Sequence, residues 1–494
     1  MKHFAKAPNE PSSPRDARLQ LQPPRSRPSA PFRAPPLLFA LTLPFAMCTN
    51  RLFRARYSSP LWAGILALTV FFADISIAGT LLPFYVDEVL HSEVRWVGIA
   101  ITTQYAFATV GMFSTGLLAD VIGLRRTVLL VSAANVVLLN IVGQAKSVGA
   151  LVAIRACLGF CNPYALGLSW VATVAPRERL ARWMAAAVAV ANATILCSGA
   201  IAGALRGPQL WIAAAIASVL PAIVAVYLLG AREAETSAVP AAAAPAATDA
   251  AADDATAEAK EEKPPPPPKS KATTRGALAK VVRTRYFWAC AWSPFVQGTY
   301  MGAMMQTLAP LVLKSLHNWP ESDVARIFQL CGFGGLIAHA SATPYFSSKM
   351  WRHRAVQGLS ITNAGLLIAY GLLGKTYSHA ALVLPILGFI NTAVCLGIVN
   401  FMCALLARTI APEALGSVTG LTRCLFTLGY ASMPAAFVPM LTAGNLLAPC
   451  LIVATMFASK VVLLEWGARK LPEPTTEQSA SKTVEVAPPE AERT

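Results

Sequence analysis

The chain has 494 residues, of which 55% are hydrophobic and only 13% are charged. Soluble globular proteins carry about 25% charged residues, so this composition excludes a soluble protein and indicates one that crosses the membrane many times. A net charge of +16 would suggest nucleic-acid binding in a soluble chain. Here the basic residues gather in the tails and in alternate loops, and no nucleic-acid motif accompanies them.

The first segment, residues 1–60, is rich in proline, serine and arginine, which predicts a disordered tail. Its apolar run, residues 37–47, is too short to cross a bilayer, which takes about 20 residues. A secretory signal peptide is disfavoured because the leader before this run is long, whereas an organelle transit peptide fits a segment rich in arginine and poor in acids. We expect a basic cytosolic tail and keep organelle targeting as an alternative.

Apolar segments then predict twelve membrane-spanning helices in two groups of six. The first group is expected at residues 61–86, 96–119, 127–144, 148–174, 183–205 and 210–230. The second group is expected at residues 286–314, 324–345, 355–374, 380–406, 415–438 and 444–467. Between the groups, residues 231–285 are rich in alanine, acids and proline and predict a disordered cytosolic linker, and a polar, disordered tail covers residues 468–494.

The two groups, residues 61–230 and 286–467, form a repeat on the scale of a domain. An even number of spans places both termini on one side of the membrane. The loops on that side are rich in lysine and arginine, which indicates that it is the cytosolic side. We therefore predict an all-α membrane protein with twelve transmembrane helices in two six-helix bundles, and a substrate site near the midplane between them.

The most specific pattern is GLLADVIGLRR, residues 116–126, between the second and third spans. Gly116 and Gly123 would let the two helix ends come close, and Asp120 could meet the positive N-terminal end of a helix or an arginine. Arg125 and Arg126 mark the cytosolic side.

This loop resembles the signature loop of the major facilitator superfamily, Gly-x-Leu-Ala-Asp-Arg-x-Gly-Arg-Lys. It departs from that pattern at Val121 and Leu124, where the family has basic residues. The resemblance implies the two-bundle transporter fold and transport by alternating access. It also implies a conformational latch on the cytosolic side, made by Gly116, Asp120, Gly123 and Arg125. An ordinary polar loop between two spans is the alternative.

Asp74 lies midway along the first span and is followed by Pro83 near the other end of that span. A charge at the membrane centre costs about 2.5–3.5 kcal/mol and needs a reason. Desolvation raises the pKa of a carboxyl group, so such a residue can exchange a proton near neutral pH. The arrangement resembles the first helix of drug:proton antiporters and vesicular amine transporters, which implies that Asp74 is a proton-coupling site. A structural salt bridge is the alternative.

Arg155, followed by Gly159 four residues later, resembles the fourth-helix motif of the same superfamily. Arginine keeps its proton, so it does not carry one, but it can tune a nearby carboxylate or hold an anionic substrate. In related antiporters the first and fourth helices line the cavity, so the resemblance implies that Asp74 and Arg155 act together. A purely structural role for Arg155 is the alternative.

Arg423 lies about two turns into the eleventh span and matches no family motif. It can face the cavity and bind an anion, or it can extend to the cytosolic surface. On the seventh span, which contributes to the central site in the superfamily, Gln297 is a further candidate substrate-binding residue. Two intramembrane arginines against one acid favour an organic acid or another anionic metabolite as substrate.

These features predict a monomeric, proton-coupled transporter that exports a small organic molecule across the plasma membrane by antiport. Its expected partners are the substrate, protons and the lipid bilayer, without nucleic acid, cofactor or metal. Cys157 and Cys161 share a helix face but have no histidine nearby, and no catalytic motif supports an enzyme. The alternatives are a vesicular or organelle carrier of amines or other cations, and a sensor or scaffold that kept the fold without transport.

Overall fold

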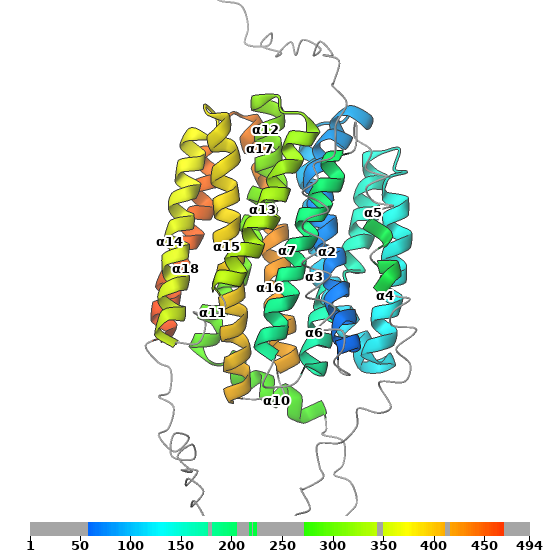
Figure 1. Cartoon of the computed structure of the whole chain (residues 1–494), viewed down its shortest axis with the longest axis vertical. Coiled ribbons are helices and arrows are strands. Elements are labelled where there is room, and N and C mark those ends of the chain that lie inside the picture. Colours follow the sequence, from blue (N-terminus) through cyan, green and yellow to red (C-terminus); the bar gives the residue numbers. More distant parts are fainter. Residues whose placement is uncertain are drawn as a thin grey trace, which may run out of the picture. The chain divides into compact units, whose positions relative to one another are not determined.

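The computed structural model describes residues 58–175, 180–204, 217–219, 221–224, 271–342, 349–410 and 415–468, and every regular element among them is a helix (Figure 1). Nine of the helical stretches in these ranges are long and apolar enough to cross a membrane. Described helical residues lie at every expected span, although most of the sixth, residues 210–230, falls outside the described residues. Residues 231–270 of the predicted linker also fall outside them, as do the predicted tails apart from residues 58–60 in α2 and 468 in α18.

The N-terminal half begins with an apolar helix that ends in a short π-helical segment. Its described elements are α2 (Ser58–Phe84), η1 (Tyr85–Val89), α3 (Arg95–Ile122), α4 (Leu124–Val142), α5 (Val148–Phe160), α6 (Tyr164–Val174) and α7 (Leu180–Ala204). Between α3 and α4 the chain reverses at Gly123 alone, where φ is 91°, a conformation that favours glycine. The predicted loop is therefore shorter than expected, because the helices continue on both sides of this one residue.

The C-terminal half is also built from α-helices and one π-helical segment. Its elements are α11 (Arg285–Thr299), η4 (Tyr300–Leu308), α12 (Ala309–His317), α13 (Glu321–Ala342), α14 (Lys349–Leu373), α15 (Ser378–Ile410), α16 (Leu415–Ser432), α17 (Pro434–Thr442) and α18 (Leu447–Ala468). Before them comes α10 (Lys271–Val282), which is helical although we expected these residues to belong to the flexible linker. Its C-terminal apolar residues Leu278, Val281 and Val282 pack into the core of this half, which explains why the linker orders there.

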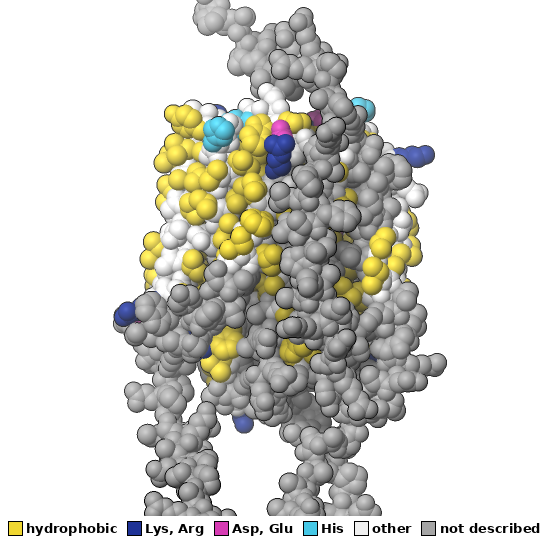
Figure 2. All heavy atoms as spheres, in the orientation of Figure 1, with side chains coloured by type: hydrophobic (Ala, Val, Ile, Leu, Met, Phe, Trp, Pro, Cys, Tyr) yellow, Lys and Arg dark blue, Asp and Glu magenta, His cyan; other side chains and the backbone are white. Residues whose placement is uncertain are grey.

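The helices run between two ends of the bundle, which we call the upper end, containing α12, and the lower end, containing α10 (Figure 1). On the face shown in Figure 2, described hydrophobic side chains cover the middle, whereas charged and histidine side chains lie toward the ends. Apolar side chains around the middle are expected where a helix bundle meets lipid.

The two halves meet along two seams, one between α7 and α13 and one between α3 and the pair α16–α17. Small residues make the first seam close: a Cβ atom on Gly199 would lie 3.1 Å from the Gln329 nitrogen, and one on Gly203 would lie 3.0 Å from the Ala325 Cβ. The four-residue spacing of these glycines in the fifth span thus serves helix packing.

Within the C-terminal half, α11 and α16 approach until their backbones touch. A Cβ atom on Gly298 would lie 1.9 Å from the Phe426 carbonyl oxygen, and one on Gly429 would lie 2.0 Å from the Phe295 carbonyl oxygen. We expect Gly298→Ala or Gly429→Ala to destabilise the folded protein by about 1–3 kcal/mol, because neither backbone can yield without separating the helices.

Thermal unfolding of the purified protein in detergent measures this effect. Gly365→Ala is the matched control, because Gly365 lies in α14 with nothing within 4 Å of its Cβ position. Alanine there should leave stability unchanged or raise it by up to about 1 kcal/mol, through its helix propensity. Equal melting temperatures for all three variants would contradict the close packing of α11 and α16.

Candidate functional site

Asp74, midway along α2, forms a buried ion pair with Arg155 of α5. The Arg155 Nη1 atom lies 2.7 Å from the Asp74 Oδ1 atom. The Arg155 side chain is 2% exposed and that of Asp74 is 13% exposed, so solvent screens the pair poorly. The structure thus brings together the two charges that the sequence placed on the first and fourth spans.

Local features of the sequence put Arg155 in this position. Ser147 caps α5 by accepting a hydrogen bond from the Ala150 nitrogen at 3.2 Å, so the helix begins two turns before Arg155. One turn after Arg155, Gly159 packs directly on α3, where a Cβ atom would lie 1.8 Å from the Gln104 carbonyl oxygen. Because Gly159 has no side chain and follows Arg155 by one turn, α5 can lie directly against α3 near the ion pair.

Gln104 of α3 completes the surroundings of the carboxylate by donating from Nε2 to the Asp74 Oδ2 atom at 2.5 Å. Each carboxylate oxygen thus has a donor. Arg155 is less well satisfied, because its buried Nε and Nη2 atoms have no hydrogen-bond acceptor within the described ranges. The ion pair therefore carries no net charge, and the guanidinium of Arg155 keeps two N–H groups that donate no hydrogen bond to the described residues.

Arg423 of α16 is a second buried guanidinium, 2% exposed. Its Nη1 atom donates a hydrogen bond to the Tyr164 hydroxyl, and its guanidinium lies 5.0 Å from the centre of the Tyr164 ring. Tyr164 is the first residue of α6, where the Asn162 side chain caps the helix by accepting from the Tyr164 nitrogen. Among the residues that the structure describes, no carboxylate pairs with Arg423, and its Nε atom has no partner.

A cavity of about 50 Å³, counted as the space open to the centre of a water molecule, lies between the two halves and is lined by Arg423. Its other polar lining residues are Tyr164, Asn192, Thr392 and Asn400. Its aromatic and aliphatic walls include Phe72, Leu168, Ile195, Met301, Phe389 and Phe426. Arg423 lies eight residues from the start of α16, about 12 Å along the helix, so the cavity is well inside the membrane-spanning part of the fold. The site pairs one cation with mostly apolar walls.

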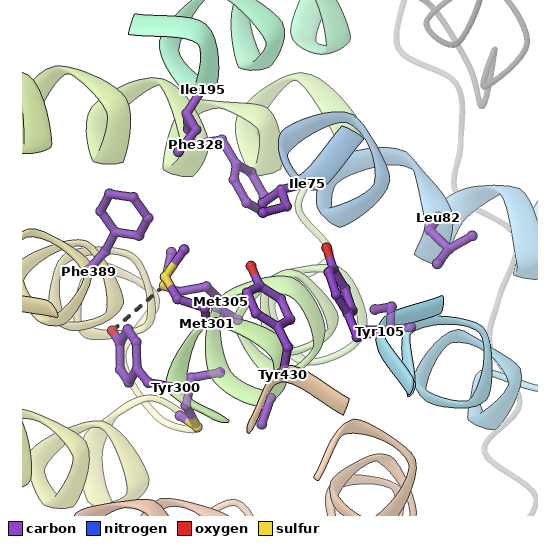
Figure 3. Packing of buried hydrophobic residues seen from close by; sticks show 14 of the residues in the cluster. Ile75, Leu82, Tyr105, Ile195, Tyr300, Met301, Met305, Phe328, Phe389 and Tyr430 are labelled. Atoms are coloured by element: carbon purple, nitrogen blue, oxygen red, sulfur yellow. Dashed lines mark hydrogen bonds between the residues drawn. The ribbon is translucent and has the colours of Figure 1, made fainter. Parts of the chain in front are cut away.

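Next to the cavity, buried aromatic and polar groups join the halves, since Phe426 of the cavity wall contacts Tyr430. Tyr105 of α3 stacks on Tyr430 of α16, with ring centres 4.1 Å apart, and both belong to the buried cluster shown in Figure 3. Gln306 of η4 donates from Nε2 to the Ile75 carbonyl oxygen at 2.9 Å, one residue from Asp74. The C-terminal half therefore contacts the backbone next to the ion pair. A π-helical turn at such a place is typical of functional sites.

Gln297 does not line this cavity, although we predicted it as a substrate-binding residue. It is fully buried inside the C-terminal half. With its amide oxygen facing the available donors, it accepts from the Ser293 hydroxyl and from the Lys460 Nζ atom, each at 3.3 Å. A role for Gln297 in substrate binding stays a prediction, since one residue of helix rotation decides whether a side chain faces the cavity or the bundle interior.

Lys460 of α18 is a buried cation that the sequence analysis missed. It is fully buried, its Nζ atom lies 2.9 Å from the Cys395 Sγ atom, and it pairs with no carboxylate within the described ranges. The signal was present, because a lysine within the last span carries the same cost as the arginines. Its position seven residues before the span ends suggests reach to the surface, which is how long basic side chains near helix ends often behave.

The predicted latch residues lie in α3, in α4 and at the break between these helices. Gly123 forms the break between α3 and α4, as described above. Gly116 lies within α3, where a Cβ atom would meet nothing within 4 Å, so it is not needed for a close helix approach. Asp120 lies in α3, but its side chain falls outside the described part of the chain, and Arg125 lies in the first turn of α4. The latch thus stays a prediction.

Buried charges and a cavity between two helical bundles define a membrane transporter of the two-bundle type. The chain belongs to the Major Facilitator Superfamily, whose family model matches residues 22–434. Membership indicates a secondary transporter rather than an enzyme. In the described ranges no three histidine, cysteine, aspartate or glutamate residues come together as metal ligands.

The chain also resembles a solved structure, the crystal structure of the human organic anion transporter MFSD10 (TETRAN). The two share 15% sequence identity over 83% of this chain and 98% of that one, with a TM-score of 0.55. A similarity at this level of identity shows the fold alone. No curated protein matches the chain.

Proposed function

We propose that this protein is a proton-coupled secondary transporter of small organic anions. The observation that carries the proposal is Arg423, a buried cation that lines the cavity and pairs with no carboxylate in the described residues. A buried charge without a counter-ion is costly, and a substrate carboxylate or sulfonate would supply one. The similar fold of MFSD10, named as an organic anion transporter, is compatible with this substrate class.

The cavity walls narrow the chemistry of the anion further. The aromatic rings of Phe72, Phe389 and Phe426 and the aliphatic side chains around them favour an apolar body. Asn192 and Asn400 offer amide groups, and the Asn400 Nδ2 atom is buried without an acceptor. A compact organic acid with an apolar body and one or two further polar atoms would satisfy both the guanidinium and the amides.

Asp74 is the proposed proton site. The ion pair with Arg155 requires a charged carboxylate, so proton binding breaks it and changes the packing of α2, α5 and α3. Gln306, which binds the adjacent peptide at Ile75, would carry this change to the C-terminal half. Asp120 and Arg125 are the proposed latch at the cytosolic side, with both tails in the cytosol and the plasma membrane as location. Antiport with export is the mode that the drug:proton antiporter resemblance implies.

Proton movement in proteoliposomes tests this proposal. The purified chain is reconstituted with an internal pH dye and challenged with carboxylates, amines and hydrophobic drugs. We expect proton flux with organic anions and at least a hundredfold loss of that flux in Asp74→Asn, because the variant has no group that titrates at this site. Proton flux with amines alone would contradict the anion assignment and favour the cation carrier.

Two other functions compete. A vesicular or organelle carrier of cations would use the Asp74 carboxylate as its binding group, but that carboxylate already accepts from Arg155 and Gln104. Localisation of a tagged chain distinguishes an organelle from the plasma membrane. A sensor that kept the fold without transport would show the wild-type phenotype with Asp74→Asn.

A further inference from the structure

The proton site and the anion site carry charges that influence one another. Asp74 and Arg155 form one neutral pair, and Arg423 adds a positive charge at the cavity. One aromatic cluster connects the two cations. Tyr164 contacts Arg423 and Phe426. Phe426 contacts Tyr430, which stacks on Tyr105, and Tyr105 interacts electrostatically with both Asp74 and Arg155. Because these surroundings are apolar, a change of charge at the Asp74–Arg155 pair acts on Arg423 with little screening by solvent.

Proton binding at Asp74 makes this region more positive. The neutralised carboxyl no longer balances Arg155, whose Nε and Nη2 atoms already lack acceptors. In the described residues, the charged or titratable groups that face Asp74 are Arg155 from α5, Tyr105 from α3 and Tyr430 from α16. None of them is a second carboxylate that could take over the role of counter-ion.

The sign of the coupling follows from these charges. Antiport requires that proton and substrate compete, as a cation and a proton do for one carboxylate. An anion does not compete for Asp74, and the charged carboxylate repels it. Proton binding removes this repulsion and exposes a second guanidinium, so each ligand increases the affinity for the other. We propose that the protein is a proton–anion symporter, an inference that rests on the proposed function and replaces its antiport mode.

The test uses 2-naphthalenesulfonate, an anion with an apolar aromatic body that stays charged across the physiological pH range. It cannot cross lipid as a neutral acid, which would imitate symport. We expect its affinity for the purified full chain to rise as the pH falls, by up to about tenfold per pH unit, because one proton accompanies each anion. Asp74→Asn imitates the protonated state and should bind with high affinity at every pH.

Competition predicts the reverse, with weaker binding by the wild type at low pH and weak binding by Asp74→Asn at every pH. Either that pattern or an affinity independent of pH would overturn symport and leave anion transport standing. Absence of binding at every pH would count against the anion site, and hence against the proposed function. The wild-type pH series decides the sign even where the variant fails to fold.

Transport measurements complete the test. In proteoliposomes with the membrane potential clamped, an acidic exterior should drive accumulation of the labelled sulfonate inside. Asp74→Asn should lose this accumulation but still exchange labelled for unlabelled probe, because its site binds the anion without a proton. Expulsion of preloaded probe by an acidic exterior would overturn the inference. Protein-free liposomes set the background.

Discussion

Arg423→Gln is expected to weaken the binding of an organic anion by about 30-fold to 5,000-fold. Removing one member of a buried charge pair costs about 2–5 kcal/mol, because the remaining charge keeps its desolvation cost and loses its partner. Here the remaining charge is that of the bound substrate, held next to Tyr164 and Arg423 in an apolar cavity. Equilibrium binding of an arylsulfonate to the purified variant measures the loss.

Lys460→Met is the matched control. It also removes a buried cation from the C-terminal half, but Lys460 does not line the cavity. We expect its anion affinity to remain within about twofold of the wild type, and its melting temperature to be equal or higher, since methionine fills the space without a buried charge. Arg423→Lys should recover only part of the affinity, because lysine lacks the planar fork of donors. If Arg423→Gln and the wild type bound the arylsulfonate with equal affinity, the proposal that the substrate is an organic anion would be contradicted.

Opening of the upper end is expected to increase as the pH rises through about 7. Lys314 of α12 lies 2.7 Å from the Asp87 Oδ2 atom and 3.5 Å from the Glu88 Oε1 atom, so it links the C-terminal half to η1 of the N-terminal half. Glu321, at the first residue of α13, is buried beside this link, and its Oε1 atom has no hydrogen-bond partner in the described residues. The pKa of Glu321 is raised to about 7, mainly by burial and in smaller part by the negative charge of Glu88, whereas Lys314 opposes the shift.

The direction of the effect follows from this raised pKa. The closed end binds the Glu321 proton more tightly than an open end, where the carboxyl would have its ordinary pKa near 4.5. Closure is therefore favoured at low pH and weakens as Glu321 ionises. Between pH 6 and 8 we expect the closed population to fall about tenfold relative to the open one.

Hydrogen–deuterium exchange of residues 85–95 and 309–320 reports this opening. Glu321→Gln should make the exchange independent of pH near 7. Lys314→Gln leaves Asp87, Glu88 and Glu321 without their shared cation, so it should increase exchange at every pH. Lys375→Gln is the control, because the Lys375 Nζ atom donates to the Gly444 carbonyl oxygen of its own half and, among the described residues, forms no ion pair across the halves. Exchange that falls with rising pH would contradict the assignment of Glu321 as the titrating group.

The sequence by itself determined the class of protein and the plan of its fold. Hydropathy and the distribution of basic residues are local properties, and they predicted the two helical groups that the family assignment and the structure show. Asp74, Arg155 and Arg423 stood out in the same way, because the cost of a charge inside a membrane depends on its position in the chain and needs no knowledge of its neighbours.

Only the tertiary structure decided what these charges contact. Asp74 and Arg155 are 81 residues apart in sequence, and the close approach of α5 to α3 at Gly159 joins them. Arg423 faces the cavity, whereas Gln297 turns into the bundle toward Lys460, and hydropathy cannot distinguish these outcomes. The direction of a side chain is set by the rotation of its helix against its neighbours, and that rotation is determined by packing across the whole bundle.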